Sequence, residues 1–299
     1  MIVRHNVYRN NLADLGLLYI AVIWGSTFFV VKDSLAYVDP VLLVGYRFIV
    51  AALLIGCFLI YRRKPWLTNL KSGGILGILL WLCYVPQTIG LQFTTASNSG
   101  FITGLFVAFV PLFAFVLFQE LPSPAKVLAV FTSILGLWFL TGGLAEINAG
   151  DGLTIVTAMA FAAYILVADR YAKDNVDPYI LSFQQFVVVG GLSVIAGFIF
   201  QFPFTVASPG TLWVILFLTI FPTLSAFVIQ MMAQKYTAPV KVSLILALEP
   251  IFAAVFAWTL GGETFIPSRS IGGVLVVLAI IVAEVPSRPW RLIRTTGQA

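Results

Sequence analysis

The sequence predicts an all-α integral membrane protein with ten transmembrane helices, arranged as two inverted five-helix repeats. Three observations lead to this fold class. The first is composition, because 60% of the 299 residues are hydrophobic and only 10% are charged, whereas a soluble domain carries about 25% charged residues. The second is the number of apolar runs long enough to cross a bilayer. The third is a set of landmarks that recurs in the second half of the chain.

Ten apolar stretches of about 20 residues divide the chain, and this is the length a helix needs to cross the hydrocarbon core. They end at polar, charged or Pro/Gly breaks such as Arg62-Arg63-Lys64, where a helix meets the lipid headgroups. The first stretch runs on to Val31 without a cleavage site of small residues, so we expect it to be retained. The expected spans begin near Leu12, Pro40, Gly73, Ser97, Ala125, Asp151, Pro178, Pro209, Pro239 and Arg269.

The distribution of basic residues predicts the orientation, because short cytoplasmic loops hold an excess of Lys and Arg. With the N-terminus inside, 14 of the 17 basic residues fall in cytoplasmic segments, while Lys32 and Arg269 fall outside and Arg47 lies within a span. We therefore expect both termini in the cytoplasm. The basic residues form no stripe or tail, so the net charge of +5 predicts no nucleic-acid partner.

The chain contains an internal repeat. Val38-Asp39-Pro40 recurs as Val176-Asp177-Pro178, and Asp14 precedes the first copy much as Asp151 precedes the second. Further pairs in the same order are Phe48 and Phe186, Pro86 and Pro222, Thr95-Ala96 and Thr237-Ala238, and Glu120 and Glu263. We predict one repeat over residues 12–143 and a second over 151–285. Five spans per copy invert the second one, an arrangement typical of transporters with a substrate site near the midplane; a duplicated scaffold without a transport role is the alternative.

Four prolines fall inside the expected spans: Pro86, Pro111, Pro222 and Pro250. Each removes a helical hydrogen bond, which a membrane tolerates only where protein or a wet cavity covers the freed carbonyl. Such prolines mark either hinges or packing kinks. The matching positions of Pro86 and Pro222 favour a hinge for that pair.

Arg47 and Glu249 are the charged residues that lie well inside the spans. Glu249 lies about ten residues into its span and therefore near the midplane, where a carboxylate is a functional candidate. Its role stays open between proton coupling and a structural acid beside Pro250. Arg47 would reach Glu249 if the second and ninth helices were neighbours.

Polar and aromatic residues at mid-span depth predict an apolar cavity with scattered hydrogen-bonding groups. Such a cavity suits a small zwitterion or neutral metabolite with an apolar side chain. Aromatic walls would set affinity, while Gln87 and Asn98 would orient the charged end. The candidate substrate-binding residues are Trp24, Trp81, Tyr84, Gln87, Asn98, Tyr164 and Ser243.

Most of the rival functions lack the residues they need, and one stays open. The only histidine is His5 and no H-E-x-x-H occurs, so we expect no enzyme, metal or cofactor. A phosphorylated-metabolite antiporter is disfavoured because it needs two or more deep cations, whereas only Arg47 is available. Proton-coupled efflux of cationic or hydrophobic drugs stays open because of Glu249. A channel would not need an inverted repeat.

Several segments together resemble the EamA family of the drug/metabolite transporter superfamily. They are Trp24-Gly25-Ser26-Thr27-Phe28, Tyr46-Arg47-Phe48, Thr95-Ala96-Ser97-Asn98, and Leu248-Glu249-Pro250 with Gly262-Glu263. The resemblance covers nearly the whole chain and implies a multi-pass exporter of the bacterial inner membrane that works by alternating access. The sequence is also similar to YddG-type amino-acid exporters, which implies outward transport of aromatic and other apolar amino acids. No oligomeric state follows from the residues.

Overall fold

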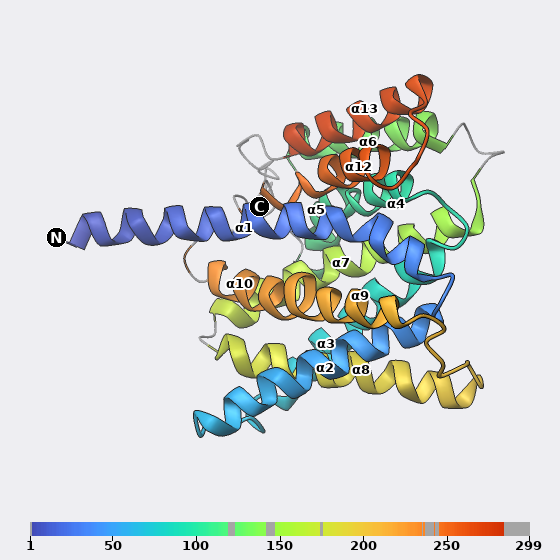
Figure 1. Cartoon of the computed structure of the whole chain (residues 1–299). Coiled ribbons are helices and arrows are strands. Elements are labelled where there is room, and N and C mark those ends of the chain that lie inside the picture. Colours follow the sequence, from blue (N-terminus) through green and yellow to red (C-terminus); the bar gives the residue numbers. More distant parts are fainter. Residues whose placement is uncertain are drawn as a thin grey trace, which may run out of the picture.

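The computed structural model describes residues 2–118, 123–141, 147–173, 176–234, 236, 242 and 245–283. Every regular element within these ranges is helical (Figure 1). The elements are α1 (Ile2–Ser34), α2 (Pro40–Tyr61), α3 (Leu70–Gly90), α4 (Ala96–Thr103), α5 (Phe106–Phe118), α6 (Pro124–Thr141), α7 (Ala149–Lys173), α8 (Pro178–Ile199), α9 (Pro209–Thr219), the π-helical turn η2 (Ile220–Ser225), α10 (Ala226–Ala233), α12 (Glu249–Thr259) and α13 (Pro267–Ala283).

Among the described residues, seven helical segments are long and apolar enough to cross a membrane. They are Leu12–Ser34, Pro40–Tyr61, Leu70–Gly90, Ala96–Val116, Ala149–Tyr171, Pro178–Ile199 and Pro209–Ala233. Val127–Gly136 and Ser270–Ala279 are shorter apolar helices. The start expected near Pro239 lies outside the described residues. Within that region Val242, Ile245 and Leu246 are helical, and α12 begins at Glu249 after a turn.

The two Val-Asp-Pro motifs start helices, as the sequence predicts. The Asp39 carboxylate accepts hydrogen bonds from the backbone N–H groups of Val41 (2.9 Å) and Leu42 (3.1 Å) at the start of α2. Asp177 accepts one from Tyr179 N–H (2.9 Å) at the start of α8. In both helices proline follows the cap at a position where no N–H is needed.

The helices pack mainly between the two halves of the chain. Helix α2 lies along α8 and α6 along α13, at opposite ends of the bundle in Figure 1. Helix α3 packs on α7 and α8, and α1 packs on α12 and α10. Gly73 and Gly77 permit the close approach of α3 to α8, since a Cβ there would lie only 2.2 Å from the Gln184 side chain and 2.5 Å from Val188. Two small residues four positions apart on a helix allow such close packing.

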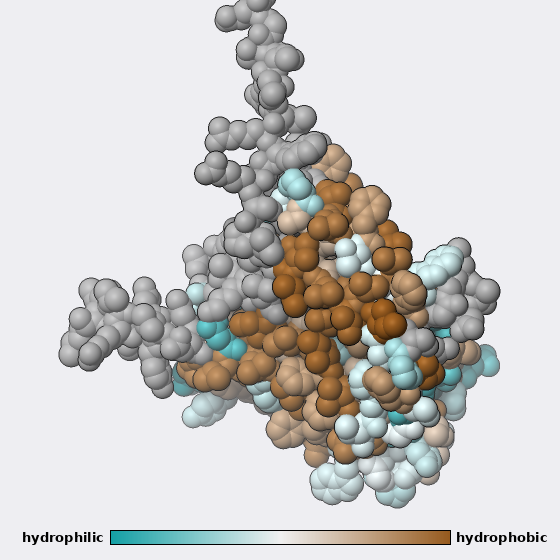
Figure 2. All heavy atoms as spheres, turned by 90° about the horizontal axis from the view of Figure 1, so that it is seen from above, coloured by the Kyte–Doolittle hydropathy of each residue, from teal (hydrophilic) through white to brown (hydrophobic). Residues whose placement is uncertain are grey.

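The outer surface carries a broad apolar area. Figure 2 shows a broad hydrophobic face over α6, α12 and α13. Its exposed side chains include Phe131 and Ile134 of α6 and Val274 and Leu278 of α13. Exposed apolar side chains over this extent are expected for helices that face acyl chains.

The four prolines occupy different settings. Pro86 and Pro111 lie inside the continuous helices α3 and α5, and Pro222 lies within η2. Pro250 is the second residue of α12, where a missing N–H costs nothing, and it follows a turn at Ala247 and Leu248 that separates α12 from the helical residues Ile245 and Leu246. The fourth expected span also has a break, between α4 and α5 at Gly104 and Leu105.

Candidate functional site

Phe227 of α10 lies at the centre of a buried aromatic cluster. It is fully buried, and its ring centroid lies 5.3–6.4 Å from five other rings. These rings come from α1, α2, α3, α7 and α8 and belong to Trp24, Phe48, Tyr84, Tyr164 and Phe186. Aromatic contacts of this kind hold elements of both halves around one point.

A small cavity of about 30 Å³ lies beside this cluster. Helices α1, α3, α4, α7, α10 and α12 supply its walls. The lining residues are Trp24, Thr27, Phe28, Cys83, Tyr84, Gln87, Thr103, Phe161, Phe227 and Glu249. The Gln87 amide donates a hydrogen bond to the Thr103 hydroxyl (3.0 Å) and so joins α3 to α4 at the cavity.

Glu249 brings a carboxylate into this cavity. It is the first residue of α12 and is 5% exposed. Its Oε2 atom is buried and has no hydrogen-bond partner among the described residues. A buried polar oxygen without a partner is costly, so this atom is the strongest indication of a ligand contact in the cavity.

Arg47 does not pair with Glu249. Its Nε donates to the Thr223 hydroxyl (2.9 Å), and its guanidinium carbon lies 4.8 Å from the centroid of the Tyr84 ring. The separation follows from the packing, because α2 lies along α8 whereas α12 lies on α1 and α4.

The Thr223 hydroxyl also replaces a hydrogen bond that Pro222 cannot make within its helix. A proline at this position cannot donate to the Leu218 carbonyl one turn earlier, and the Thr223 hydroxyl donates to that carbonyl instead (2.7 Å). The indole N–H of Trp24 donates to the carbonyl of Pro222 itself (2.7 Å). The π-helical turn is thereby tied to both α1 and α2, the latter through Arg47.

The structure brings together only part of the predicted substrate site. Trp24, Tyr84 and Gln87 line the cavity. Trp81 instead donates its indole N–H to Ser193 of α8 (3.1 Å). Tyr164 is fully buried and donates to Gln185 (2.9 Å). Asn98 lines a separate cleft, and Ser243 lies outside the described residues.

Three cavity rings, Phe28, Phe161 and Phe227, were not predicted. The repeat could have identified Phe161, since it stands ten residues after Asp151 just as Trp24 stands ten after Asp14. For Phe227 the sequence offers no signal that separates it from the other 25 phenylalanines.

The cleft that includes Asn98 has a volume of about 320 Å³ and lies between α4, α12 and the start of α13. The Glu263 carboxylate closes over the N-terminus of α4: it accepts from Ala96 N–H (2.5 Å), Ser97 N–H (3.2 Å) and the Ser97 hydroxyl (2.6 Å). Lys32 donates to the neighbouring Thr94 carbonyl (2.6 Å). Charged side chains from α1 and from the segment after α12 therefore hold the start of α4 in place.

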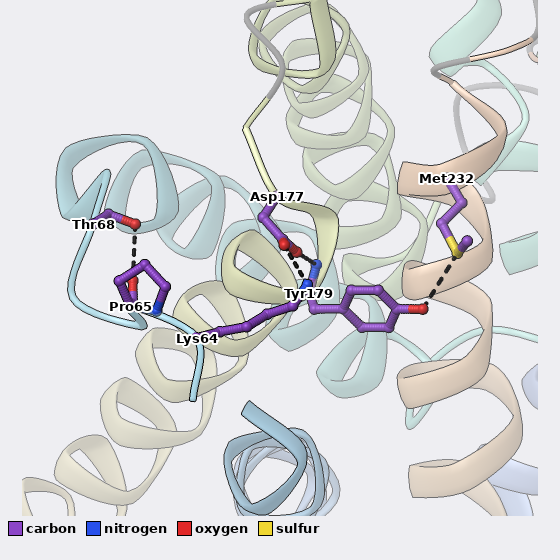
Figure 3. A network of polar contacts seen from close by, with 6 residues as sticks. All are labelled: Lys64, Pro65, Thr68, Asp177, Tyr179 and Met232. Carbon is purple, nitrogen blue, oxygen red and sulfur yellow. Dashed lines mark hydrogen bonds and ion pairs between the residues drawn. The ribbon is translucent and has the colours of Figure 1, made fainter. Parts of the chain in front are cut away.

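A second set of contacts joins the halves where α2 ends and α8 begins. Lys64 forms an ion pair with Asp177 and lies over the ring of Tyr179, whose hydroxyl points to Met232 of α10 (Figure 3). The Gln184 amide donates to the carbonyls of Trp66 (2.8 Å) and Thr68 (2.6 Å). The segment between α2 and α3 is therefore held to α8 by hydrogen bonds to its backbone carbonyls and by the Lys64–Asp177 ion pair.

Comparison with known proteins agrees with this arrangement. The EamA-like transporter family matches the chain twice, over residues 11–142 and 148–284. An uncharacterized transporter of Archaeoglobus fulgidus is 33% identical over 276 residues, which cover 91% of this chain and 85% of that protein. The uncharacterized inner membrane transporter YedA of Escherichia coli K12 is 23% identical over 94% of this chain and 95% of its own length.

A solved crystal structure shares the fold, with a TM-score of 0.68 at 19% identity, over 91% of this chain and 96% of the other. Both relatives are named as transporters, in agreement with the prediction that the chain is not an enzyme. With its apolar spanning helices and two family matches, the chain is a multi-pass membrane transporter that belongs to the EamA-like transporter family.

Proposed function

We propose that this transporter exports aromatic and other apolar amino acids across the bacterial inner membrane by alternating access. The observation that carries the proposal is the Glu249 carboxylate, one oxygen of which has no hydrogen-bond partner within the described part of the chain and lies in a cavity walled by aromatic rings. A carboxylate in such surroundings attracts an ammonium group, and aromatic faces add to that attraction. The rings of Trp24, Phe161 and Phe227 offer contact for an apolar side chain.

The carboxylate end of a bound amino acid would also have hydrogen-bond donors nearby. The Gln87 amide and the Thr103 hydroxyl are donors on the cavity wall that now bond to each other. A substrate carboxylate could accept hydrogen bonds from both once that bond opens. Glu249 and this pair would then hold the two charged ends of a zwitterion, and the side chain would be read by the rings.

The cavity is too small for an amino acid. Its volume is about 30 Å³, whereas pockets that bind small-molecule ligands measure roughly 300–1,000 Å³, so an amino acid enters only after helices have moved. The break between α4 and α5 and the π-helical turn at Pro222 are two of the points where the described helices depart from regular α-helix. We assign the hinges to these two places, and to Pro86 as the repeat counterpart of Pro222.

We also propose ten spans in two inverted repeats, 12–143 and 151–285, with both termini in the cytoplasm. The double family match supports this division. So do the helix pairs: a twofold relation between the copies would pair α2 with α8 and α6 with α13, and would match the α1–α10 contact with the contact between α3 and α7. The excess of basic residues on one side supports the orientation.

Efflux of cationic or hydrophobic drugs, coupled to protons, is the second candidate, because Glu249 and the rings would serve a cation equally well. A phosphorylated substrate is disfavoured, since the deep cation Arg47 is already bonded to Thr223 and covered by Tyr84.

Counterflow in proteoliposomes separates these candidates. Liposomes preloaded with one unlabelled compound are given labelled phenylalanine, leucine, alanine, a nucleoside, a hexose phosphate or a cationic dye. The proposal expects rapid exchange of phenylalanine and leucine and none of the hexose phosphate. Exchange of the dye without exchange of any amino acid would establish the second candidate instead.

A further inference from the structure

The surface where α2 packs on α8 carries an apolar groove of about 460 Å³, separate from the cavity and the cleft. Its walls come from both helices and from the connection that follows α2. The residues that define it are Ile49, Leu53, Ile60, Trp66, Phe183 and Val187. Gly191 leaves space at its edge, since a Cβ there would meet no atom within 4 Å.

The groove opens toward the acyl chains of one leaflet. Leu53 is 63% exposed and Ile60 is 69% exposed, and both lie within the spanning segment Pro40–Tyr61. The rise from Ile49 to Ile60 is about 16 Å along a helix, close to half of the roughly 30 Å hydrocarbon core. A groove of this length accommodates one acyl chain from the middle of the bilayer to its surface.

Positive charge gathers at the end of the groove that carries Trp66, a residue type that favours the headgroup level. Arg62 and Arg63 follow directly after α2, are exposed, and form no ion pair with the residues that the structure describes. The adjacent Lys64 is already paired with Asp177. The two arginines are thus free cations at the depth of lipid phosphates.

The backbone conformation of Arg63 favours glycine, so the presence of arginine there indicates that its side chain has a function. Arg63 has a φ of +49°, and the bonds from Arg63 N–H to Ile60 (3.0 Å) and from Lys64 N–H to Leu59 (2.9 Å) form the helix-ending motif that usually has glycine at this position. Arginine here is strained where glycine would not be.

We propose that the groove binds an anionic phospholipid, with one acyl chain between α2 and α8 and its phosphate group held by Arg62 and Arg63. Guanidinium groups bind phosphate through paired hydrogen bonds, and basic residues at the ends of membrane helices attract anionic lipids. Lipid binding in this groove involves no transported substrate, so this proposal is independent of the proposed function.

Native mass spectrometry of the purified protein tests the proposal, with phosphatidylglycerol and phosphatidylcholine of identical acyl chains as probes. Wild type should retain phosphatidylglycerol in preference. Arg62→Gln and Arg63→Gly should each weaken its binding roughly fivefold and leave phosphatidylcholine unchanged. Arg63→Gly should also raise the thermal stability of the lipid-free protein, because glycine relieves the backbone strain; a loss of lipid is then not a loss of fold.

Filling the groove provides the second arm. Gly191→Leu places a side chain into the groove and should reduce retention of both lipids. Gly152→Leu on α7 is the matched control, since a Cβ there also meets no atom within 4 Å and Gly152 does not line the groove. Equal retention of the two lipids by wild type, or unchanged retention in Gly191→Leu, would overturn the proposal.

Cys57 lines the groove and is exposed, whereas Cys83 is buried. Oxidation in native membranes should leave Cys57 unlinked if lipid occupies the groove. A disulfide-linked dimer through Cys57 would show that a second copy covers this face, and the lipid proposal would be wrong.

Discussion

The rings of Phe48 and Phe186 meet edge to face with their centroids 5.6 Å apart. Each stands nine residues after the aspartate of a Val-Asp-Pro motif. Trp24 and Phe161, which stand ten residues after Asp14 and Asp151, meet in the same manner at 5.9 Å. Equivalent residues of two copies touch each other only where a twofold axis passes between them, so these contacts support an axis through the aromatic cluster.

The proposed inverted arrangement predicts a labelling pattern. In a protein without Cys57 and Cys83, a cysteine at Lys173 should react with a membrane-impermeant maleimide only from the cytoplasmic side, and one at Asn148 only from the opposite side. The reason is that α7 (Ala149–Lys173) spans the membrane between them. Intact spheroplasts and inside-out vesicles distinguish the sides. Labelling of both positions from one side would exclude the inverted repeat and the ten-span count.

Glu249→Gln should weaken binding of substrates that carry an amine. A hydrogen bond between charged groups contributes about 1.5–3 kcal/mol, so the Kd for phenylalanine should rise roughly tenfold to a hundredfold. Competition assays with phenethylamine, which lacks the carboxylate, and 3-phenylpropionate, which lacks the amine, measure the effect on each end. The amine should lose affinity in the mutant and 3-phenylpropionate should not.

The same variant distinguishes coupling from recognition. If Glu249 carries the coupling proton, Glu249→Gln should abolish the pH dependence of accumulation while exchange of preloaded substrate continues. Equal affinities of wild type and mutant for all three compounds, together with unchanged pH dependence, would leave Glu249 a structural acid at the start of α12.

The ring walls should set selectivity for large side chains. Phe227→Leu and Tyr84→Leu each remove a ring that lines the cavity, and an aromatic contact is worth about 0.5–1.5 kcal/mol. Transport of phenylalanine should therefore fall several-fold more than transport of alanine. Trp81→Phe is the control, because Trp81 bonds to Ser193 at the contact with α8; it should lower stability without changing selectivity. Equal losses for both substrates in the cavity variants would mean that these rings only pack the bundle.

The sequence predicts helix starts better than it predicts the site. Pro40, Pro178 and Pro209 begin helices where expected, because an apolar run after a capping residue is a local signal. Which face of a helix points inward depends on how segments distant in the sequence pack against it. Trp81 and Tyr84 lie three residues apart on α3, yet one bonds to α8 and the other lines the cavity. Periodicity alone could not separate them in spans that are apolar on most sides.

Loss of the Glu263 carboxylate should loosen the cleft beside α4. This carboxylate accepts three hydrogen bonds from Ala96 and Ser97, and Glu263→Gln removes the charge and one of its two acceptor oxygens. Because a charged hydrogen bond contributes about 1.5–3 kcal/mol, the population with this cleft open should rise roughly tenfold. A cysteine at Asn98, which is 6% exposed on the cleft wall, should then react faster with an impermeant maleimide. Ser270→Ala is the matched control, since the Ser270 hydroxyl lines the same cleft but bonds to the Ile266 carbonyl. If Glu263→Gln and Ser270→Ala react at the wild-type rate, contacts other than Glu263 keep the cleft closed.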